Sequence, residues 1–148
     1  MFLIVSIETK YSHSSKGKQQ MRSIAPFLYV GLGGLLGSLL RYGMTLMCQN
    51  FSFFPYGTLV SNVAGCFIIG VVSGLAVDVP LLSSEARLFL ATGVCGGFTT
   101  LSSLVYELAQ MYRDGQYATG ALYFSATFAG AALSFFLGTI LIKIIYKG

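Results

Sequence analysis

Charge is scarce in this sequence. Asp, Glu, Lys and Arg together make up 9% of the 148 residues, whereas hydrophobic residues make up 55%. A water-soluble domain of this length needs roughly a quarter of its residues charged to cover its surface, but a surface in contact with lipid has no such need. The composition therefore excludes an ordinary soluble domain and predicts an integral membrane protein, with lipid as one of its partners.

Groups that carry out catalysis or bind metals are also scarce. The sequence has one histidine, His13, and three cysteines, Cys48, Cys66 and Cys95, which form no CxxC pair. We interpret the cysteines as small packing residues rather than as redox or metal ligands. Because there is also no carboxylate pair and no nucleophile beside a base, the sequence predicts no enzyme. No basic stripe for a nucleic acid remains either, since the basic residues lie in the N-terminal tail and mostly at the ends of apolar segments.

Four apolar segments follow a polar N-terminal tail, residues 1–24. Each segment is near the roughly 20 residues that cross a bilayer as a helix. The sequence therefore predicts an all-α membrane protein with one four-helix transmembrane domain at residues 25–148. Its four transmembrane helices are expected at about residues 26–47, 57–77, 87–111 and 117–145.

The tail and the flanking charges bear on how the chain is inserted. Met21 begins a stretch that leads directly into the first apolar segment, so we interpret the first twenty residues as a start-site artefact or a disordered tail. Four spans place both termini on one side of the membrane, and an excess of flanking positive charge favours the cytoplasm for that side. The flanking residues are Arg22, Arg87, Lys143 and Lys147, against Arg113 on the other side.

Small residues recur at four-residue spacing within the predicted spans. Helices in lipid associate through close backbone contact at such residues, because burying apolar surface against a neighbour gains little in a bilayer. Since four short helices can hardly enclose a water-lined path, a second subunit is expected. The predicted packing positions are Gly33 and Gly37 in the first span, Gly70 and Gly74 in the second, and Gly130 and Gly138 in the fourth.

Several polar side chains fall where lipid would not tolerate them. Asn62 lies in the middle of the second span, and Thr58 shares its face one turn earlier. Tyr123 and Thr127 share a face of the fourth span in the same way. Each pair fits either hydrogen bonding between helices or an ion path, and both interpretations stay open. Arg41, late in the first span, either reaches the membrane surface or draws anions into a vestibule.

The third span combines glycines with hydroxyl residues. Its stretch GVCGGFTTLSSL, residues 93–104, favours a broken helix, because freed carbonyls at membrane depth survive where they line a cavity or bind a cation. A plain kink stays open as the alternative. Glu107 is expected at the membrane interface near Arg113, so no Asp or Glu is expected inside a span.

Three fragments carry a resemblance to a known family. They are GGLLGSLLRY at 33–42, GTLVSNVAGCFIIG at 57–70 and GVCGGFTTLSS at 93–103. In this order and spacing the chain closely resembles the CrcB/Fluc family of fluoride channels over residues 27–145. The resemblance implies passive export of fluoride across the cell inner membrane by an antiparallel dual-topology dimer, formed with itself or with a related subunit.

The resemblance also implies sites. A structural sodium ion would lie on the two-fold axis of the dimer, bound by the backbone carbonyls of Gly96 and Thr99. The implied fluoride pathway contains Arg41, Thr58, Asn62, Leu101, Ser102, Ser103, Leu104, Tyr123 and Thr127.

One motif departs from the family pattern. The family usually has two phenylalanines in the third span, where this chain has Leu101 and Leu104. The edge of a phenyl ring carries partial positive charge and can face an anion, but leucine offers only apolar bulk. Either hydroxyls and Asn62 supply most of the donors, or a related subunit brings the missing rings, in which case this chain alone does not conduct. A small multidrug-type exporter is a further alternative, but it would need a carboxylate inside a span.

Overall fold

The computed structural model describes the backbone of residues 2–51, 53–77 and 81–147, and side chains within residues 24–51, 53–76 and 81–146. These residues form helices and connecting loops, without a strand among them. In chain order the helices are α1 (Phe2–Cys48), α2 (Tyr56–Val77), α3 (Ser84–Arg87), the π-helix η1 (Leu88–Cys95), α4 (Gly96–Phe98), α5 (Leu101–Arg113) and α6 (Tyr117–Lys147).

Four stretches of these helices are long and apolar enough to cross a membrane. They are Ile24–Cys48, Tyr56–Ala76, Ser84–Arg113 and Tyr117–Tyr146. The predicted all-helical membrane protein with four spans is therefore confirmed, with ends within a few residues of those expected. The third stretch is assembled from α3, η1, α4 and α5 in succession.

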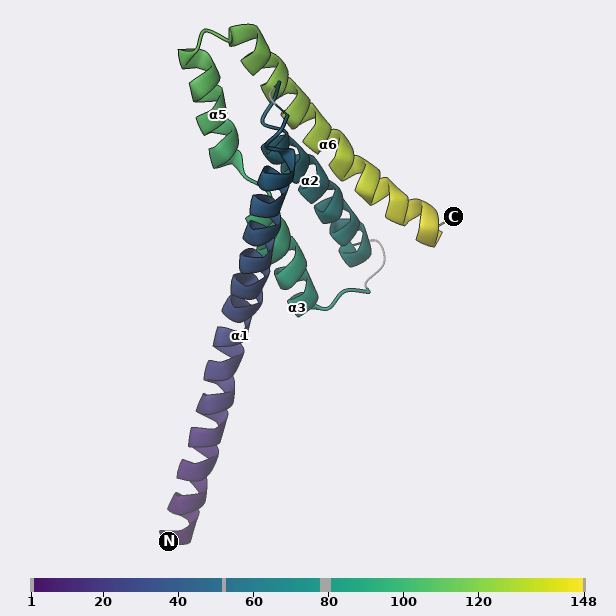
Figure 1. Cartoon of the computed structure of the whole chain (residues 1–148). Coiled ribbons are helices and arrows are strands. Elements are labelled where there is room, and N and C mark those ends of the chain that lie inside the picture. The colour runs from purple at the N-terminus through teal and green to yellow at the C-terminus, as the bar shows by residue number, and fades with distance from the viewer. Residues whose placement is uncertain (1, 52, 78–80, 148) are drawn as a thin grey trace.

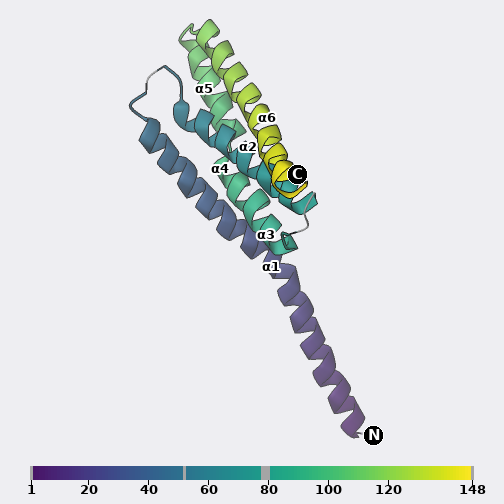
Figure 2. The same cartoon turned by 90° about the vertical axis from the view of Figure 1, so that its right-hand side faces the viewer.

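The first helix is longer than its span. α1 runs from Phe2 through the predicted tail and continues into the membrane-spanning stretch that begins at Ile24. Its N-terminal part projects away from the other helices in both views (Figures 1 and 2). The side chains of residues 1–23 lie outside the described residues, and a start-site artefact at residues 1–20 stays a prediction.

The first and third spans pack through glycines. A Cβ atom added at Gly33 would meet the carbonyl oxygen of Phe89, and one added at Gly37 would meet that of Val94. Both contacts lie on η1, so α1 and η1 approach with their backbones touching. Only a residue without a side chain permits that approach.

The second and fourth spans pack in the same way. Gly70 of α2 lies against the backbone of Phe135, and Gly138 of α6 lies against the backbone of Phe67. Further along the same contact, Gly74 faces the side chain of Ile142 and Gly130 faces Val63. The predicted packing glycines therefore all lie at contacts between helices.

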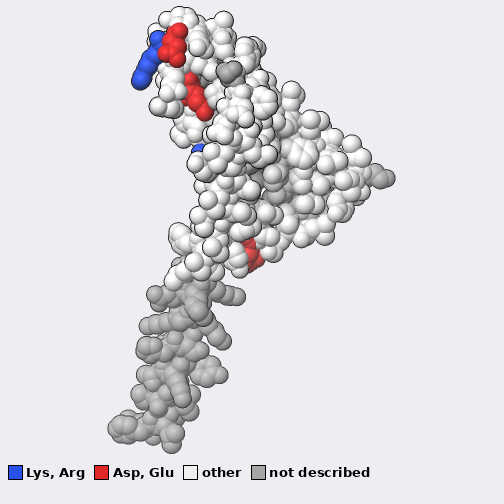
Figure 3. Space-filling view, in the orientation of Figure 1, with Lys and Arg blue, Asp and Glu red and all other residues white. Residues whose placement is uncertain are grey.

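The surface of the subunit is strongly apolar. Large apolar side chains of every span are exposed, among them Leu39, Phe128 and Ile144. The face seen in Figure 3 is almost entirely uncharged, and most of the charged atoms it shows gather at the end where α5 and α6 join. Because lipid tails solvate apolar side chains, such a surface suits a bilayer.

The turn between α5 and α6 sets the fourth span beside the third. Gly115 has φ 71°, a left-handed conformation that favours glycine, and the N–H of Gln116 donates to the carbonyl of Met111 at 2.8 Å. Below this turn the two helices diverge (Figure 1).

Candidate functional site

The third span is interrupted between α4 and α5. α4 ends at Phe98, and Thr99 and Thr100 both have extended backbones, with ψ of 152° and 119°. Thr100 then caps α5, because its Oγ1 accepts a hydrogen bond from the N–H of Ser103 at 3.1 Å. The glycines and threonines of this stretch thus produce two helical segments joined by two extended residues.

Asn62 of α2 binds Thr100, one of the two extended residues of this interruption. The N–H of Thr100 donates to Asn62 Oδ1 at 2.7 Å, and Asn62 Nδ2 donates to the carbonyl of Thr100 at 3.1 Å. The side-chain amide therefore pairs with the peptide groups of Thr100 as a second backbone would. Asn62 is buried, so these bonds also satisfy a polar group that lipid could not. Of the two interpretations left open for Asn62, bonding between helices is present in the structure.

The interruption removes helical hydrogen bonds from two carbonyls. In a continuous α-helix the N–H of Thr100 would donate to the carbonyl of Gly96, and the N–H of Ser103 to that of Thr99. Both donors are used elsewhere, by Asn62 and by the Thr100 hydroxyl. A Cβ atom added at Gly96 would meet nothing within 4 Å, so the surface beside Gly96 is open. The carbonyls of Gly96 and Thr99 have thus lost their helical partners, and Gly96 lies at an open surface.

Glu107 connects three helices. Thr58 Oγ1 of α2 donates to Glu107 Oε1 at 2.7 Å, and the hydroxyl of Tyr123 in α6 donates to Glu107 Oε2 at 2.6 Å. The expectation that no Asp or Glu lies inside a span is wrong, because Glu107 lies within Ser84–Arg113. The two short bonds from hydroxyls replace water around the half-buried carboxylate. A carboxylate in an apolar segment is itself a sign of function, and the sequence carried that signal at Glu107.

Arg41 also reaches the interrupted span. Its Nε donates to the carbonyl of Gly97 at 3.1 Å, which links α1 to α4. The side chain is half-buried, so it does not simply extend to the membrane surface. Among the remaining predicted residues, Thr127 Oγ1 donates to the backbone carbonyl of Tyr123 at 2.8 Å, and Thr100 Oγ1 lies within hydrogen-bond distance of the hydroxyls of Ser102 and Ser103.

A cavity of about 220 Å³ lies at the interruption. It brings together Asn62, Thr127 and the two predicted leucines, of which Leu101 is exposed and Leu104 is buried. Arg41, Thr58, Gly96, Ser102, Ser103 and Tyr123 do not line it. Sequence reasoning missed other lining residues, which are Cys66, Thr100, Phe128 and Ala131. Helical spacing could have found Cys66, which follows Asn62 by four residues.

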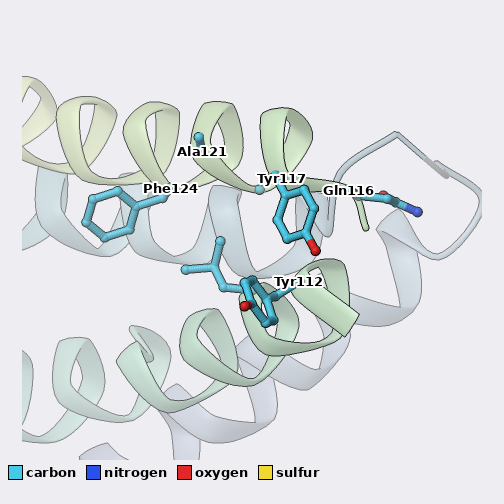
Figure 4. A pocket seen from close by; sticks show the side chains of 7 residues that line it. Tyr112, Gln116, Tyr117, Ala121 and Phe124 are labelled. Atoms are coloured by element: carbon cyan, nitrogen blue, oxygen red, sulfur yellow. The ribbon is translucent and has the colours of Figure 1, made fainter. Parts of the chain in front are cut away.

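A second cavity, of about 270 Å³, lies between α5 and α6 near their turn. The rings of Tyr112 and Tyr117 meet there edge to face at 5.2 Å (Figure 4). Phe124 forms another part of its wall and stacks on Phe128, with ring centroids 6.0 Å apart and planes 18° apart. Phe124 lines the second cavity and Phe128 lines the cavity at the interruption, so the two stacked rings lie between these cavities.

These features define a multi-pass α-helical membrane protein whose third span is interrupted around a hydrogen-bonded polar interior. The family model described as CrcB-like protein, Camphor Resistance (CrcB), matches residues 28–139, and the chain belongs to this family. The resemblance found in the sequence is thereby confirmed.

Curated relatives cover most of the chain. A fluoride-specific ion channel FluC from Chlorobium phaeobacteroides strain DSM 266 is 42% identical over 125 residues, which are 84% of this chain and 97% of the relative. Another from Chlorobaculum tepidum is 44% identical over 118 residues, 79% of this chain and 94% of the relative. A third, from Thermus thermophilus, is 47% identical over 112 residues, 74% of this chain and 89% of the relative.

Proposed function

We propose that this protein is a fluoride channel that lets fluoride leave the cytoplasm passively, down its electrochemical gradient. The observation that carries the proposal is the match over nearly the whole length of relatives named as fluoride-specific ion channels. A passive channel needs neither a catalytic group nor an energy-coupling motif, which agrees with the chemistry of the sequence. We place the channel in the inner membrane of the cell.

The polar interior supports the proposal physically. Fluoride is small and strongly hydrated, so a pore must replace its lost water with hydrogen-bond donors. An amide NH₂ has two donors, and Asn62 uses one of them on Thr100. Asn62 also lines the cavity beside the interruption, and there its second N–H would face the ion.

The proposal includes a dimer of two antiparallel copies. A single subunit leaves its cavity at the interruption open and exposes large apolar side chains around it, such as Leu101 and Phe128. A second copy would close the cavity and shield its polar groups from lipid, as membrane proteins require. A related chain in place of the second copy is the alternative, and fluoride efflux with and without that chain separates the two.

A sodium ion at the interruption is the remaining part of the proposal. The carbonyls of Gly96 and Thr99 suit it, since both have lost their helical donors and carbonyl oxygens are ligands for hard cations. When bound, the ion would supply positive charge that joins the interrupted spans of two copies. Replacing sodium by N-methylglucamine during purification should dissociate the dimer or stop its transport. An intact, active dimer without sodium would reject the site.

Fluoride efflux from liposomes tests the function. The purified chain, reconstituted alone, should release trapped fluoride to an external electrode much faster than protein-free liposomes, and chloride should stay inside. Liposomes as tight to fluoride as bare lipid would reject a channel made of this chain alone. Efflux that appears only with a related subunit would show the partner-dependent alternative. Proton-driven uptake of an organic cation would instead show a multidrug-type exporter.

A further inference from the structure

Phe128 is an exposed aromatic residue at an otherwise aliphatic and polar cavity. Its side chain is 69% exposed, while its neighbour Thr127 is 2% exposed and packs inside the subunit. Phe128 lines the cavity at the interruption and is the aromatic member of its lining. Contact with lipid would explain the exposure of the ring but not its place beside Asn62 and Thr100.

The hydroxyl donors of this cavity are already in use. Thr99 Oγ1 donates to the carbonyl of Cys95 at 2.9 Å, and Thr127 Oγ1 donates to that of Tyr123 at 2.8 Å. Thr100 Oγ1 donates to Ser103 Oγ at 3.2 Å. An anion in the cavity would therefore meet one free N–H of Asn62 and few other donors. A dehydrated anion needs more positive contacts than one N–H supplies.

The phenyl ring offers such a contact. Its edge is electrically positive and its faces are negative. The Phe124 ring lies nearly parallel to the Phe128 ring, with planes 18° and centroids 6.0 Å apart, and so limits how the Phe128 ring can tilt. The geometry points to Phe128 as a specificity-determining residue, whose ring edge faces the permeating anion opposite the amide of Asn62. This inference rests on the proposed function, and it assigns to α6 the aromatic contact that Leu101 and Leu104 cannot supply.

The test measures fluoride efflux from liposomes for variants of two phenylalanines of α6, Phe128 and Phe136. Phe128→Leu and Phe128→Met remove the ring, and Met keeps a bulky, flexible apolar side chain. Phe136→Leu is the matched control, because Phe136 is similarly exposed on α6 but does not line this cavity. Size-exclusion chromatography reports whether each variant keeps the assembly of the wild type.

Both Phe128 variants should assemble as the wild type does and lose fluoride flux by up to roughly tenfold, the scale of one aromatic contact. Phe136→Leu should conduct at the wild-type rate. Wild-type flux in Phe128→Leu or in Phe128→Met would overturn the inference, and so would an equal loss in Phe136→Leu. If the wild-type chain itself carries no fluoride, the proposed function fails as well, whereas a conducting wild type with unaffected Phe128 variants rejects the ring alone.

Discussion

Asn62→Ala removes both hydrogen bonds that fix the interruption of the third span. The N–H and the carbonyl of Thr100 then lose the partners that they have at 2.7 and 3.1 Å. The Thr100 carbonyl caps α5 and keeps the first bond of that helix, so only the N–H is left without a partner. Leaving one buried backbone group unpaired costs about 1–3 kcal/mol. Because Thr100 is half-buried, water can reach part of this peptide, and we expect the lower half of the range, about 1–2 kcal/mol.

Two measurements test the effect of Asn62→Ala, namely thermal unfolding in detergent and fluoride efflux from liposomes. Asn62→Ala should unfold at a lower temperature and conduct at least about tenfold less fluoride, since a misplaced interruption misplaces the donors of the cavity. Ser61→Ala is the matched control. Ser61 is its neighbour on α2 and fully buried, and its hydroxyl has no hydrogen-bond partner in the described part of the chain. Removing that hydroxyl should leave stability unchanged or slightly raised.

The two readouts separate positioning from direct contact with the ion. If Asn62→Ala unfolds at the same temperature as Ser61→Ala, the amide pair does not hold the interruption and the reasoning is refuted. If the variant is as stable as the wild type but no longer conducts, Asn62 acts on fluoride alone. Asn62→Asp refines the test, because it keeps the acceptor for the Thr100 N–H but sets a carboxylate oxygen against the Thr100 carbonyl. We expect it to be destabilised as well.

Three further predictions concern contacts between spans. Glu107→Gln leaves one acceptor oxygen for two hydroxyl donors and should cost about 1.5–3 kcal/mol in unfolding free energy. A double-mutant cycle with Tyr123→Phe should show coupling between the two residues. Strictly additive losses of stability would contradict the hydrogen bond to the Glu107 carboxylate. Gly37→Ala places a methyl group against the carbonyl of Val94 and should destabilise by about 1–3 kcal/mol. Gly34→Ala, which meets open space, should melt like the wild type, and equal melting of the two variants would count against the close contact of α1 with η1. Arg41→Lys loses the Nε donor to Gly97 and should cost roughly 0.5–1.5 kcal/mol. A lysine variant as stable as the wild type would show that a point charge suffices there.

Local composition was enough to predict the four spans. Each is an apolar stretch of 21 to 30 residues, and length together with apolar composition decides whether a helix can cross a bilayer. The glycine positions could also be predicted as helix contacts, because spacing places Gly70 and Gly74 on one face of a helix. What spacing could not say is which helix each face meets, so the contact of Gly33 with η1 needed the structure.

The hydrogen bonds of the interior could not be predicted either, because local spacing does not say which distant residue is the partner. Asn62 pairs with Thr100, 38 residues away, and Thr58 with Glu107, 49 residues away. No local pattern encodes such a partner. The sequence therefore marked Asn62 and Thr58 as polar residues in need of partners but left open whether protein or ion supplies them. Position 107 already fell inside the predicted third span, 87–111, but Glu107 was expected at the membrane interface because it lies near Arg113.

The structure makes α2 the helix on which the interior is assembled. Thr58 and Asn62 share one face of it and bind Glu107 and Thr100, which both belong to the interrupted span. Gly70, two turns beyond Asn62, lies against α6. In lipid, apolar surface gives helices little preference for one partner over another, so hydrogen bonds and close glycine contacts must fix the arrangement. Because the polar groups of the interior mostly hydrogen-bond one another, few donors remain for an ion. In the proposed channel, selectivity for a strongly hydrated anion would therefore depend on the few positive contacts that remain, which are the second N–H of Asn62 and the ring edge that we assign to Phe128.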